Sequence, residues 1–322
     1  MKQYDLEYSK VSFIRHSENL TYRIFSKSKD ESYLLRIHFP LSGIIDKEWL
    51  DEKIINSELL WLKSLSETTD IRVQIPVANK LGNLVTKVNH DGNEIFCTLL
   101  TWIVGIVRYE DDTYTSLQAE KLGSLLAKIH RHSENWNLPK DFDRPTYNLN
   151  SLQEDFEKLK NINNELLIFD KESELSIQKA IDKIGVFLEK DKKLNNWGLI
   201  HADLCENNYI LNEEYLSPID FSLCSFGSYT YDITVSLLHL KSELWSYFFK
   251  GYRKYRSINN NLKESIEAYI IAALIGPWAF HSTNPEEQKW LKSSITSCLN
   301  KNIPQFLNNE SYFFSKYNID IE

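Results

Sequence analysis

The sequence lacks the features that mark several common classes of protein. Its 322 residues include only four cysteines, Cys97, Cys205, Cys224 and Cys298, and these lie far apart without a CxxC pair. A zinc site and cysteine nucleophilic catalysis are therefore not expected. The balance of 37 Lys and Arg against 45 Asp and Glu gives a net charge of −8, and no basic stripe is visible. A protein that binds nucleic acid usually carries such a stripe, so we expect no nucleic-acid partner.

The chain also has little that would insert into a membrane. Residues 1–10, MKQYDLEYSK, lack the apolar core of a signal peptide. The longest apolar run, residues 268–280, is shorter than the ~20 residues that span a bilayer, and Gly276-Pro277 interrupts it. We therefore expect a buried, bent helix at this run, no membrane partner and a cytoplasmic location.

The periodicity of apolar residues changes along the chain. Alternation predicts strands within residues 11–25, 33–39, 84–88 and 94–103, with a helix over 47–65. Helical spacing then dominates in 116–136, 156–169 and 174–193, and again from about residue 231. A short β insertion near residues 199–223 interrupts the helical part. The pattern predicts an α+β fold with a small β-rich lobe, residues 1–103, and a larger, mainly helical lobe, residues 104–322.

Four polar residues inside the β insertion carry the chemistry that the sequence indicates. His201, Asp203 and Asn208 interrupt the apolar stretch 199–210, and Asp220 follows in the apolar segment 216–223. A carboxylate and an amide oxygen are hard ligands suited to Mg²⁺. A second carboxylate could orient a hydroxyl and accept its proton. Phosphoryl transfer needs this combination, although each residue alone could equally belong to a polar turn.

The ordered set resembles the aminoglycoside and choline kinase-like phosphotransferases, which share the protein-kinase fold with its two lobes. LIHADLCENNYIL, residues 199–211, is similar to their catalytic loop, and PIDFSLCSFGSYTYDI, residues 218–233, is similar to their metal-binding segment. The resemblance implies that Asp203 is the catalytic residue and that His201 supports the loop. It also implies that Asn208 and Asp220 hold Mg²⁺. Asp232 would be a structural carboxylate that binds loop backbone.

The same resemblance places a nucleotide site on the first lobe. Arg36 would contact the phosphates and Glu58 would pair with it, although either could also be an ordinary exposed residue. Main-chain groups of Thr101 and Ile103 would contact adenine, with Leu100 behind them. The hairpin at residues 15–22 has no glycine, so its phosphate contacts would come from Ser17 and Asn19.

Three functions follow from these features. The first is an ATP- and Mg²⁺-dependent kinase that transfers the γ-phosphate to a hydroxyl of a small molecule, such as an aminoglycoside or another amino-bearing, cationic compound. Residues 108–116 and the aromatic and acidic residues of 272–287, namely Trp278, Phe280, Glu286 and Glu287, would build its acceptor site. The second is a protein Ser/Thr kinase, which Cys205 disfavours because protein kinases usually carry Lys there. The third is a nucleotide-binding pseudokinase with a regulatory role.

Overall fold

The computed structural model describes residues 1–17, 19–27, 31–40, 47–107, 114–212, 215–258, 262–284 and 286–314. The chain forms two compact units, and each is described below by itself. The first unit comprises Met1–Arg108, Asn137–Arg144 and Asn208–Ser222, and the second comprises Tyr109–Trp136, Pro145–Asn207 and Leu223–Glu322. The lobe boundary between residues 103 and 104 stays a prediction.

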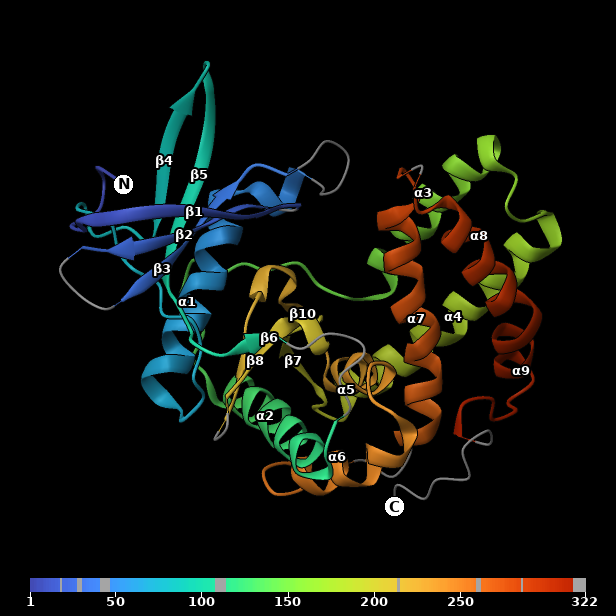
Figure 1. Cartoon of the computed structure of the whole chain (residues 1–322). Coiled ribbons are helices and arrows are strands. Elements are labelled where there is room, and N and C mark those ends of the chain that lie inside the picture. Colours follow the sequence, from blue (N-terminus) through green and yellow to red (C-terminus); the bar gives the residue numbers. More distant parts are fainter. Residues whose placement is uncertain are drawn as a thin grey trace. The chain divides into compact units, whose positions relative to one another are not determined.

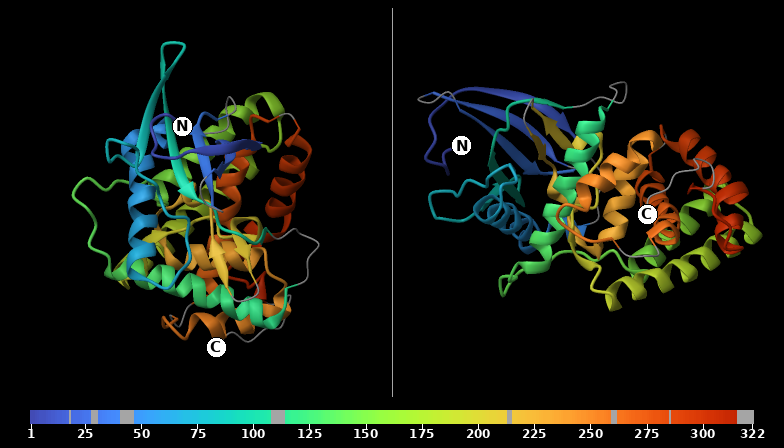
Figure 2. Two further views of the ribbon diagram at one scale, coloured as in Figure 1. Left: turned by 60° about the vertical axis from the view of Figure 1, so that its left-hand side comes forward. Right: turned by 90° about the horizontal axis from the view of Figure 1, so that it is seen from below.

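A five-stranded antiparallel sheet forms the centre of the first unit, with the strand order β1-β2-β3-β5-β4. Its strands are β1 (Tyr8–His16), β2 (Leu20–Ser26), β3 (Ser32–His38), β4 (Val85–His90) and β5 (Asn93–Thr101). They confirm the strands predicted from alternation. The β4–β5 hairpin extends beyond the other strands of this sheet (Figures 1 and 2).

One face of β3 is buried, and two polar residues lie on it. Arg36 and His38 are 5% and 8% exposed, whereas Leu35 on the other face is half-buried. Helix α1 (Glu52–Thr68) contributes Leu59, Leu62 and four other large apolar or polar side chains to the buried part of this unit. Its first turn is capped by the Asp51 side chain, which accepts a hydrogen bond from Lys53 N. The predicted helix is therefore confirmed, but its predicted start at residue 47 is too early, because the structure has a short 3₁₀ helix there.

A second, three-stranded sheet of the first unit carries part of the candidate site. It has the order β6-β8-β9, with β6 (Ile106–Val107), β8 (Tyr209–Leu211) and β9 (Leu216–Pro218). In the β8–β9 hairpin Tyr209 pairs with Pro218. The residues just outside these two strands, Asn208 and Ile219, therefore lie at the same end of the hairpin.

The second unit is mainly helical. Its helices are α2 (Ser116–Asn135), α3 (Leu149–Leu166), α4 (Lys171–Lys193), α5 (Tyr229–Leu238), α6 (Trp245–Tyr252), α7 (Leu262–His281), α8 (Gln288–Ser297) and α9 (Ile303–Leu307), and β7 (Trp197–Ile200) pairs antiparallel with β10 (Ser225–Ser228). Within this unit α2 packs on α6, while α7 packs on α3, α4 and α5 (Figure 1). The predicted α+β class with a helical second part is confirmed.

Two helices of this unit show why the sequence predicts them well. Thr115 and Gln118 form a reciprocal capping box at the start of α2, and Leu122, Leu126 and Ile129 are fully buried. The apolar run at residues 268–280 lies within α7, which continues through Pro277 to His281. Most of its residues are buried, as predicted. Within the described residues, no helix combines the length and the hydropathy needed to cross a bilayer.

A buried carboxylate of α4 fixes the start of α5. Asp191 is 4% exposed and accepts hydrogen bonds from Ser228 Oγ and, at 2.6 Å, from the Tyr269 hydroxyl. Ser228 is in turn the N-cap of α5, since its Oγ accepts a hydrogen bond from Thr230 N. Helices α4, α5 and α7 are therefore held together by polar contacts as well as by apolar packing.

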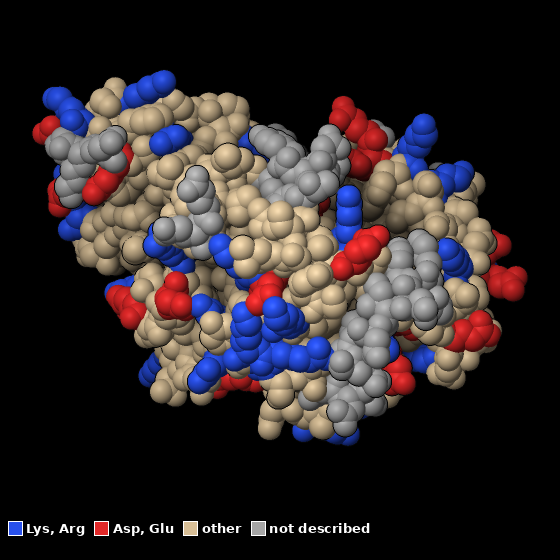
Figure 3. Space-filling model, turned by 60° about the horizontal axis from the view of Figure 1, so that its bottom comes forward, with Lys and Arg blue, Asp and Glu red and all other residues tan. Residues whose placement is uncertain are grey.

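The surface is not uniformly acidic, although the net charge is −8. Figure 3 shows a face of the molecule on which Lys and Arg side chains gather. On α6 and just beyond it, Lys250, Arg253 and Lys254 are all exposed. Glu120 of α2 accepts hydrogen bonds from Lys250 and Lys254, so part of this positive charge is balanced locally.

Candidate active site

The predicted catalytic loop follows directly after β7. His201 is fully buried, and its Nδ1 lies 3.3 Å from Asp203 N, which donates to it. Ala202 has a φ of 68°, a left-handed conformation that is uncommon for a residue with a side chain. Such conformations persist only where surrounding contacts enforce them, and they concentrate at functional sites. The resulting sharp turn presents Asp203, which is half-buried.

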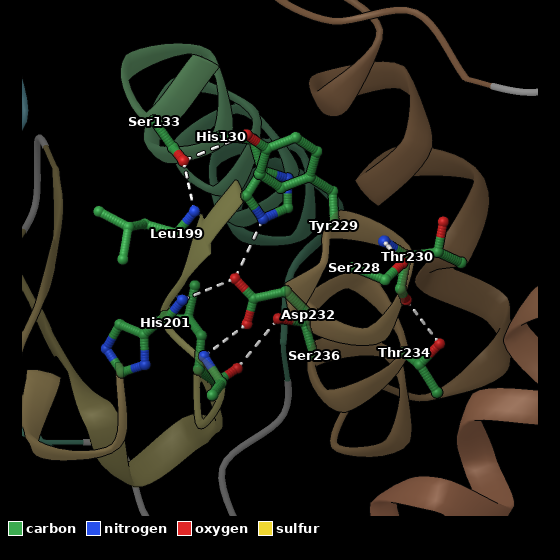
Figure 4. A network of polar contacts seen from close by, with 12 residues as sticks. His130, Ser133, Leu199, His201, Ser228, Tyr229, Thr230, Asp232, Thr234 and Ser236 are labelled. Atoms are coloured by element: carbon green, nitrogen blue, oxygen red, sulfur yellow. Dashed lines mark hydrogen bonds and ion pairs between the residues drawn. The ribbon is translucent and has the colours of Figure 1, made fainter. Parts of the chain in front are cut away.

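Asp232 of α5 supplies the contacts that enforce this turn. Its Oδ2 accepts a hydrogen bond from His201 N, and its Oδ1 accepts one from Ala202 N, both at 2.9 Å (Figure 4). The carboxylate is completely buried. The structure therefore shows Asp232 binding the loop backbone, as the resemblance implied. Ser236, one turn later on α5, donates to Leu204 O at 3.0 Å and fixes the other side of the loop.

Asp232 also contacts a histidine for which the sequence predicts no role, His130 of α2. His130 Nε2 is 3.0 Å from Asp232 Oδ2, and its Nδ1 is 2.8 Å from the Tyr252 hydroxyl. Burial lowers the pKa of His130 and outweighs the raising influence of the neighbouring Asp232 carboxylate. A neutral ring fits both contacts: Nε2–H donates to Asp232, and Nδ1 accepts from Tyr252. Arg256 donates to the Tyr252 hydroxyl from the far side at 3.2 Å.

The sequence contained a usable signal for His130. Leu122, Leu126 and His130 recur at intervals of four residues, so all three fall on the buried face of α2. A histidine in that position needs hydrogen-bond partners, because an unpaired buried polar group is unfavourable. Its partner could not be identified from the sequence, since Asp232 lies more than a hundred residues away.

The loop residues after Asp203 have structural contacts of their own. Cys205 N donates to Asp203 O at 2.9 Å, and burial raises the pKa of the Cys205 thiol to about 12. A thiol with this pKa stays protonated at neutral pH and is a poor nucleophile. Glu206 Oε2 lies 2.9 Å from Nδ1 of His239, the residue at the C-terminal end of α5. The loop is thereby linked to both ends of α5.

The two predicted metal ligands lie at one end of the β8–β9 hairpin. Asn208 O accepts a hydrogen bond from Ile219 N at 2.9 Å, so the residue that follows Ile219, Asp220, lies close to Asn208 along this end. Asp220 also adopts a left-handed conformation, with a φ of 60°. Asp and Asn tolerate this region better than other residues that bear a side chain. Ala202 directly precedes a predicted functional carboxylate, and Asp220 is itself one, so left-handed backbone occurs at or beside each of these two carboxylates.

The donor set at this hairpin end fits a divalent cation. Ser222 Oγ donates to Asp220 Oδ1 at 2.6 Å, and no described residue donates to Oδ2. An amide oxygen and a carboxylate oxygen suit Mg²⁺, which binds few protein groups and fills its remaining positions with water or phosphate oxygens. Ser222 thus orients the Asp220 carboxylate.

Arg144, which was not predicted as a site residue, joins the loop after Asp220 to helix α1. Its guanidinium donates to Ser222 O at 2.5 Å and to Ile54 O at 3.0 Å. It is 4% exposed and also lies over the Trp49 ring, 5.1 Å from the centroid. The sequence gives no signal of this role, because both acceptors of Arg144 are main-chain oxygens.

The predicted pair between β3 and α1 is present. Arg36 Nη2 lies 2.6 Å from Glu58 Oε1, and the two side chains are 6% and 3% exposed. A charge-assisted hydrogen bond of this length between buried groups holds the guanidinium in one place. Burial excludes the alternative that the two residues are ordinary exposed ones. A role for Arg36 in binding phosphate stays a prediction.

The other residues predicted to contact the nucleotide differ in whether their main-chain groups already form hydrogen bonds within the protein. Thr101 N donates to Ile75 O at 2.9 Å, and Trp102 N donates to Ser32 O at 3.0 Å. Within the described part of the chain, the main-chain groups of Ile103 form no hydrogen bond, so Ile103 is the better candidate for the adenine contact. Leu100 is fully buried on β5. Ser17 and Asn19 are both half-buried, and Ser17 N donates to Asn19 O at 3.2 Å; Glu18 between them lies outside the described residues.

The residues predicted to build the acceptor site differ in their exposure to solvent. Trp278 is completely buried, and its Nε1 donates to Ser294 Oγ at 2.8 Å, so it is a core residue and the prediction for it is wrong. Phe280 and Glu287 are half-buried and Glu286 is exposed. Residues 108–113 lie outside the described residues, and the prediction made for them remains open.

Three histidines are held in surroundings that disfavour a positive charge. Burial lowers the pKa of His38 well below its usual value, aided by the positive Arg36 and Arg144. Burial also lowers the pKa of His130, and it lowers that of His132 to about 4. These three residues, His38, His130 and His132, are therefore neutral at pH 7 and are called the neutral histidines below.

Comparison with known proteins agrees with this architecture. A family model described as the phosphotransferase enzyme family matches residues 10–269. A microcompartment-associated aminopropanol kinase superposes with a TM-score of 0.76 at 20% identity, covering 97% of this chain and 96% of that one. An amicoumacin kinase, solved with AMP-PNP and Ca²⁺, gives 0.72 at 17% identity over 97% and 93%.

The same comparison extends to ethanolamine kinases and confirms the fold. The enzyme of Plasmodium vivax superposes with a TM-score of 0.63 at 16% identity, covering 90% of this chain and 81% of that one. A search of curated proteins by sequence finds no significant match. The fold is protein-kinase-like, with a small β-rich lobe and a larger helical lobe, as predicted. Because the family model covers most of its length, the chain belongs to the phosphotransferase enzyme family.

Proposed function

We propose that this protein is a kinase that transfers the γ-phosphoryl group of ATP to a hydroxyl of a small molecule. The observation that carries the proposal is the loop of residues 201–205, whose strained turn is held by Asp232 through two backbone hydrogen bonds. A buried carboxylate that holds a strained turn indicates that the turn positions a reactive group, because such strain concentrates at functional sites. That group is Asp203.

In the proposed reaction Asp203 orients the acceptor hydroxyl. The hydroxyl oxygen forms a bond to the γ-phosphorus, the bond from that phosphorus to the bridging oxygen breaks, and ADP leaves. The hydroxyl proton passes to the Asp203 carboxylate. Positioning of this kind supplies much of the catalysis in phosphoryl transfer, because the transition state involves little covalent chemistry with the protein.

Two further groups of residues would serve the nucleotide. Asn208 and Asp220 are proposed to hold Mg²⁺, which when bound supplies positive charge to the phosphate oxygens. Arg36, fixed by Glu58, is proposed to pair with a phosphate oxygen. The main chain of Ile103, the leucine behind it at position 100, and Ser17 and Asn19 of the hairpin complete the proposed nucleotide site.

The structurally similar proteins include kinases of aminopropanol, ethanolamine and amicoumacin and a spectinomycin phosphotransferase. They support a small hydroxylated molecule rather than a protein as the acceptor. We expect the protein to act in the cytoplasm, where ATP is available.

The test is acceptor-dependent release of ADP from Mg-ATP across a panel of hydroxylated amines, sugars and antibiotics. Reactions without acceptor give the background of ATP hydrolysis. Labelled ATP with a cell lysate tests transfer to protein in parallel. Tight nucleotide binding without turnover on any small acceptor would contradict the proposal, and labelled protein bands would replace it with a protein kinase activity.

A further inference from the structure

A chain of buried polar side chains in the second unit leads from the predicted catalytic loop to the end of α6. Asp232 is its inner end and accepts hydrogen bonds from His201 N and Ala202 N. His130 lies 3.0 Å from Asp232 through Nε2 (Figure 4) and 2.8 Å from the Tyr252 hydroxyl through Nδ1. All three side chains of the chain are completely buried, so each of their polar groups depends on partners within the protein.

Arg256, four residues beyond the end of α6, is the outer end of this chain. Its Nη1 donates to the Tyr252 hydroxyl at 3.2 Å. The guanidinium is itself held on several sides. Its Nε and Nη2 each lie 2.8 Å from Glu134 Oε1, and its Nη1 donates to Asn196 Oδ1 at 3.0 Å. Its Cζ lies over the Tyr229 ring, 4.3 Å from the centroid. These contacts fix the position from which Arg256 donates.

The two ends of the chain allow its hydrogen bonds only one direction. A guanidinium has N–H donors and no acceptor, so the Tyr252 hydroxyl oxygen accepts from Arg256. The single hydroxyl proton of Tyr252 is then directed to His130 Nδ1. The proton of the neutral imidazole is therefore on Nε2 and is directed to the Asp232 carboxylate, which only accepts. Every donor in the chain thus points from Arg256 toward Asp232.

Arg256 excludes the opposite arrangement at the outer end. Without it, the Tyr252 hydroxyl could accept a hydrogen bond from a protonated Nδ1 of His130. One form with such a proton is the other neutral tautomer, whose Nε2 lone pair would face the Asp232 carboxylate. The second form is the imidazolium, whose charge would compete with the loop backbone for Asp232. Burial lowers the pKa of His130, and the positive charge of Arg256 lowers it further, which also disfavours the imidazolium.

We propose that Arg256 and Tyr252 are positioning residues for the phosphoryl-transfer reaction. Through His130 they keep Asp232 in place as an acceptor for the loop backbone, and Asp232 in turn holds the turn that presents Asp203. Neither residue touches the substrate. This inference rests on the proposed function, and it extends the machinery of that function from the loop to the end of α6.

The first test determines where the proton of His130 lies and requires no turnover. The nitrogen chemical shifts of the imidazole rings are recorded at pH 7 after isotope labelling of the 8 histidines, and the signals that disappear in His130→Gln identify His130. We expect a proton on Nε2 and none on Nδ1 in the wild type. Arg256→Met should place a proton on Nδ1 in a measurable fraction of the molecules. Unchanged His130 signals in Arg256→Met would overturn the inference.

The second test measures kcat for acceptor-dependent ADP release. Arg256→Met and Tyr252→Phe should each lower kcat by about tenfold or more, as is typical when a group that fixes a histidine tautomer is lost. The KM for the acceptor and the affinity for AMP-PNP with Mg²⁺ should stay within about threefold of wild type. The double variant should lose no more than the weaker of its two parents, because both changes interrupt one chain.

Two further variants distinguish positioning from a general loss of packing. Arg256→Lys keeps a group that donates and cannot accept, so it should recover most of kcat and the wild-type signals of His130. Arg253→Met removes an exposed arginine three residues earlier and should change neither measurement. Thermal denaturation gives the temperature range in which every variant is folded, and kcat is compared within that range.

The outcomes separate this inference from the proposed function. If the losses in kcat of Arg256→Met and Tyr252→Phe add in full, or if Arg256→Lys loses as much as Arg256→Met, the inference is overturned while the kinase activity stands. If the wild-type protein releases no ADP with any acceptor, the proposed function fails and the role in catalysis fails with it. The signals of His130 then still show whether Arg256 sets the direction of the chain.

Discussion

Replacing Asp232 with alanine should destabilise the protein strongly, because this one side chain satisfies three buried donors. His201 N, Ala202 N and His130 Nε2 would all lose their acceptor. Each buried donor left without a partner is unfavourable by about 1–3 kcal/mol, so three would amount to roughly 3–9 kcal/mol if nothing relaxed. Relaxation of the loop and entry of water reduce this figure. We expect a loss of about 3–5 kcal/mol, which lies toward the lower end of that range.

Urea denaturation of wild type and Asp232→Ala measures this difference in free energy of unfolding. Asp143→Ala is the matched control, because it removes an aspartate whose ion pair with Lys53 is half exposed, and it should change stability by less than about 1 kcal/mol. Faster amide exchange at His201 and Ala202 gives a local measurement. An Asp232→Ala variant as stable as the control would refute the role given to this carboxylate.

Three other predictions concern pH dependence and further variants. The neutral histidines have folded pKa values below the 6.5 of the unfolded chain, so stability should be full above pH 6.5 and should fall as the pH drops toward 4. His132→Gln should make this fall less steep. Glu58→Met should lower the free energy of unfolding by about 3–5 kcal/mol, and adding Arg36→Met should recover much of it without restoring nucleotide binding measured by calorimetry. Gly123→Ala would place a Cβ 1.9 Å from Phe248 O and should lower the melting temperature, whereas Gly276→Ala should leave it unchanged or raise it.

Local patterns explain why the secondary structure could be predicted. Alternation marked β3 and β5, and the spacing of Leu122, Leu126 and Ile129 marked α2, because burial imposes one period on strands and another on helices. The start of α1 was predicted too early. Residues 47–50 have helical spacing, but Asp51 caps the helix at residue 52 and so ends the preceding turn.

The candidate site was only partly predictable, since its support comes from distant segments. The order of His201, Asp203 and Asn208 was visible because they are close in sequence. The contacts of Asp232 with His130 and of Arg144 with Ser222 join residues about 80 to 100 positions apart. Periodicity carries no information about such pairs. The same holds for the left-handed conformation of Ala202, which is imposed by Asp232 rather than by alanine itself.

The acceptor site could not be predicted from the sequence either. Trp278 was predicted to line this site because aromatic residues are common in binding sites, but it lies on the buried face of α7 and belongs to the core.

The most direct test of the account is the effect of Asp203→Asn on acceptor-dependent ADP release and on nucleotide binding, measured side by side. If Asp203 orients the hydroxyl and accepts its proton, turnover should fall by about 10²–10⁴-fold. The affinity for the non-hydrolysable analogue AMP-PNP with Mg²⁺ should stay within about threefold of wild type, because Asp203 is proposed to act on the acceptor. Turnover close to the wild-type rate in Asp203→Asn would contradict the central claim.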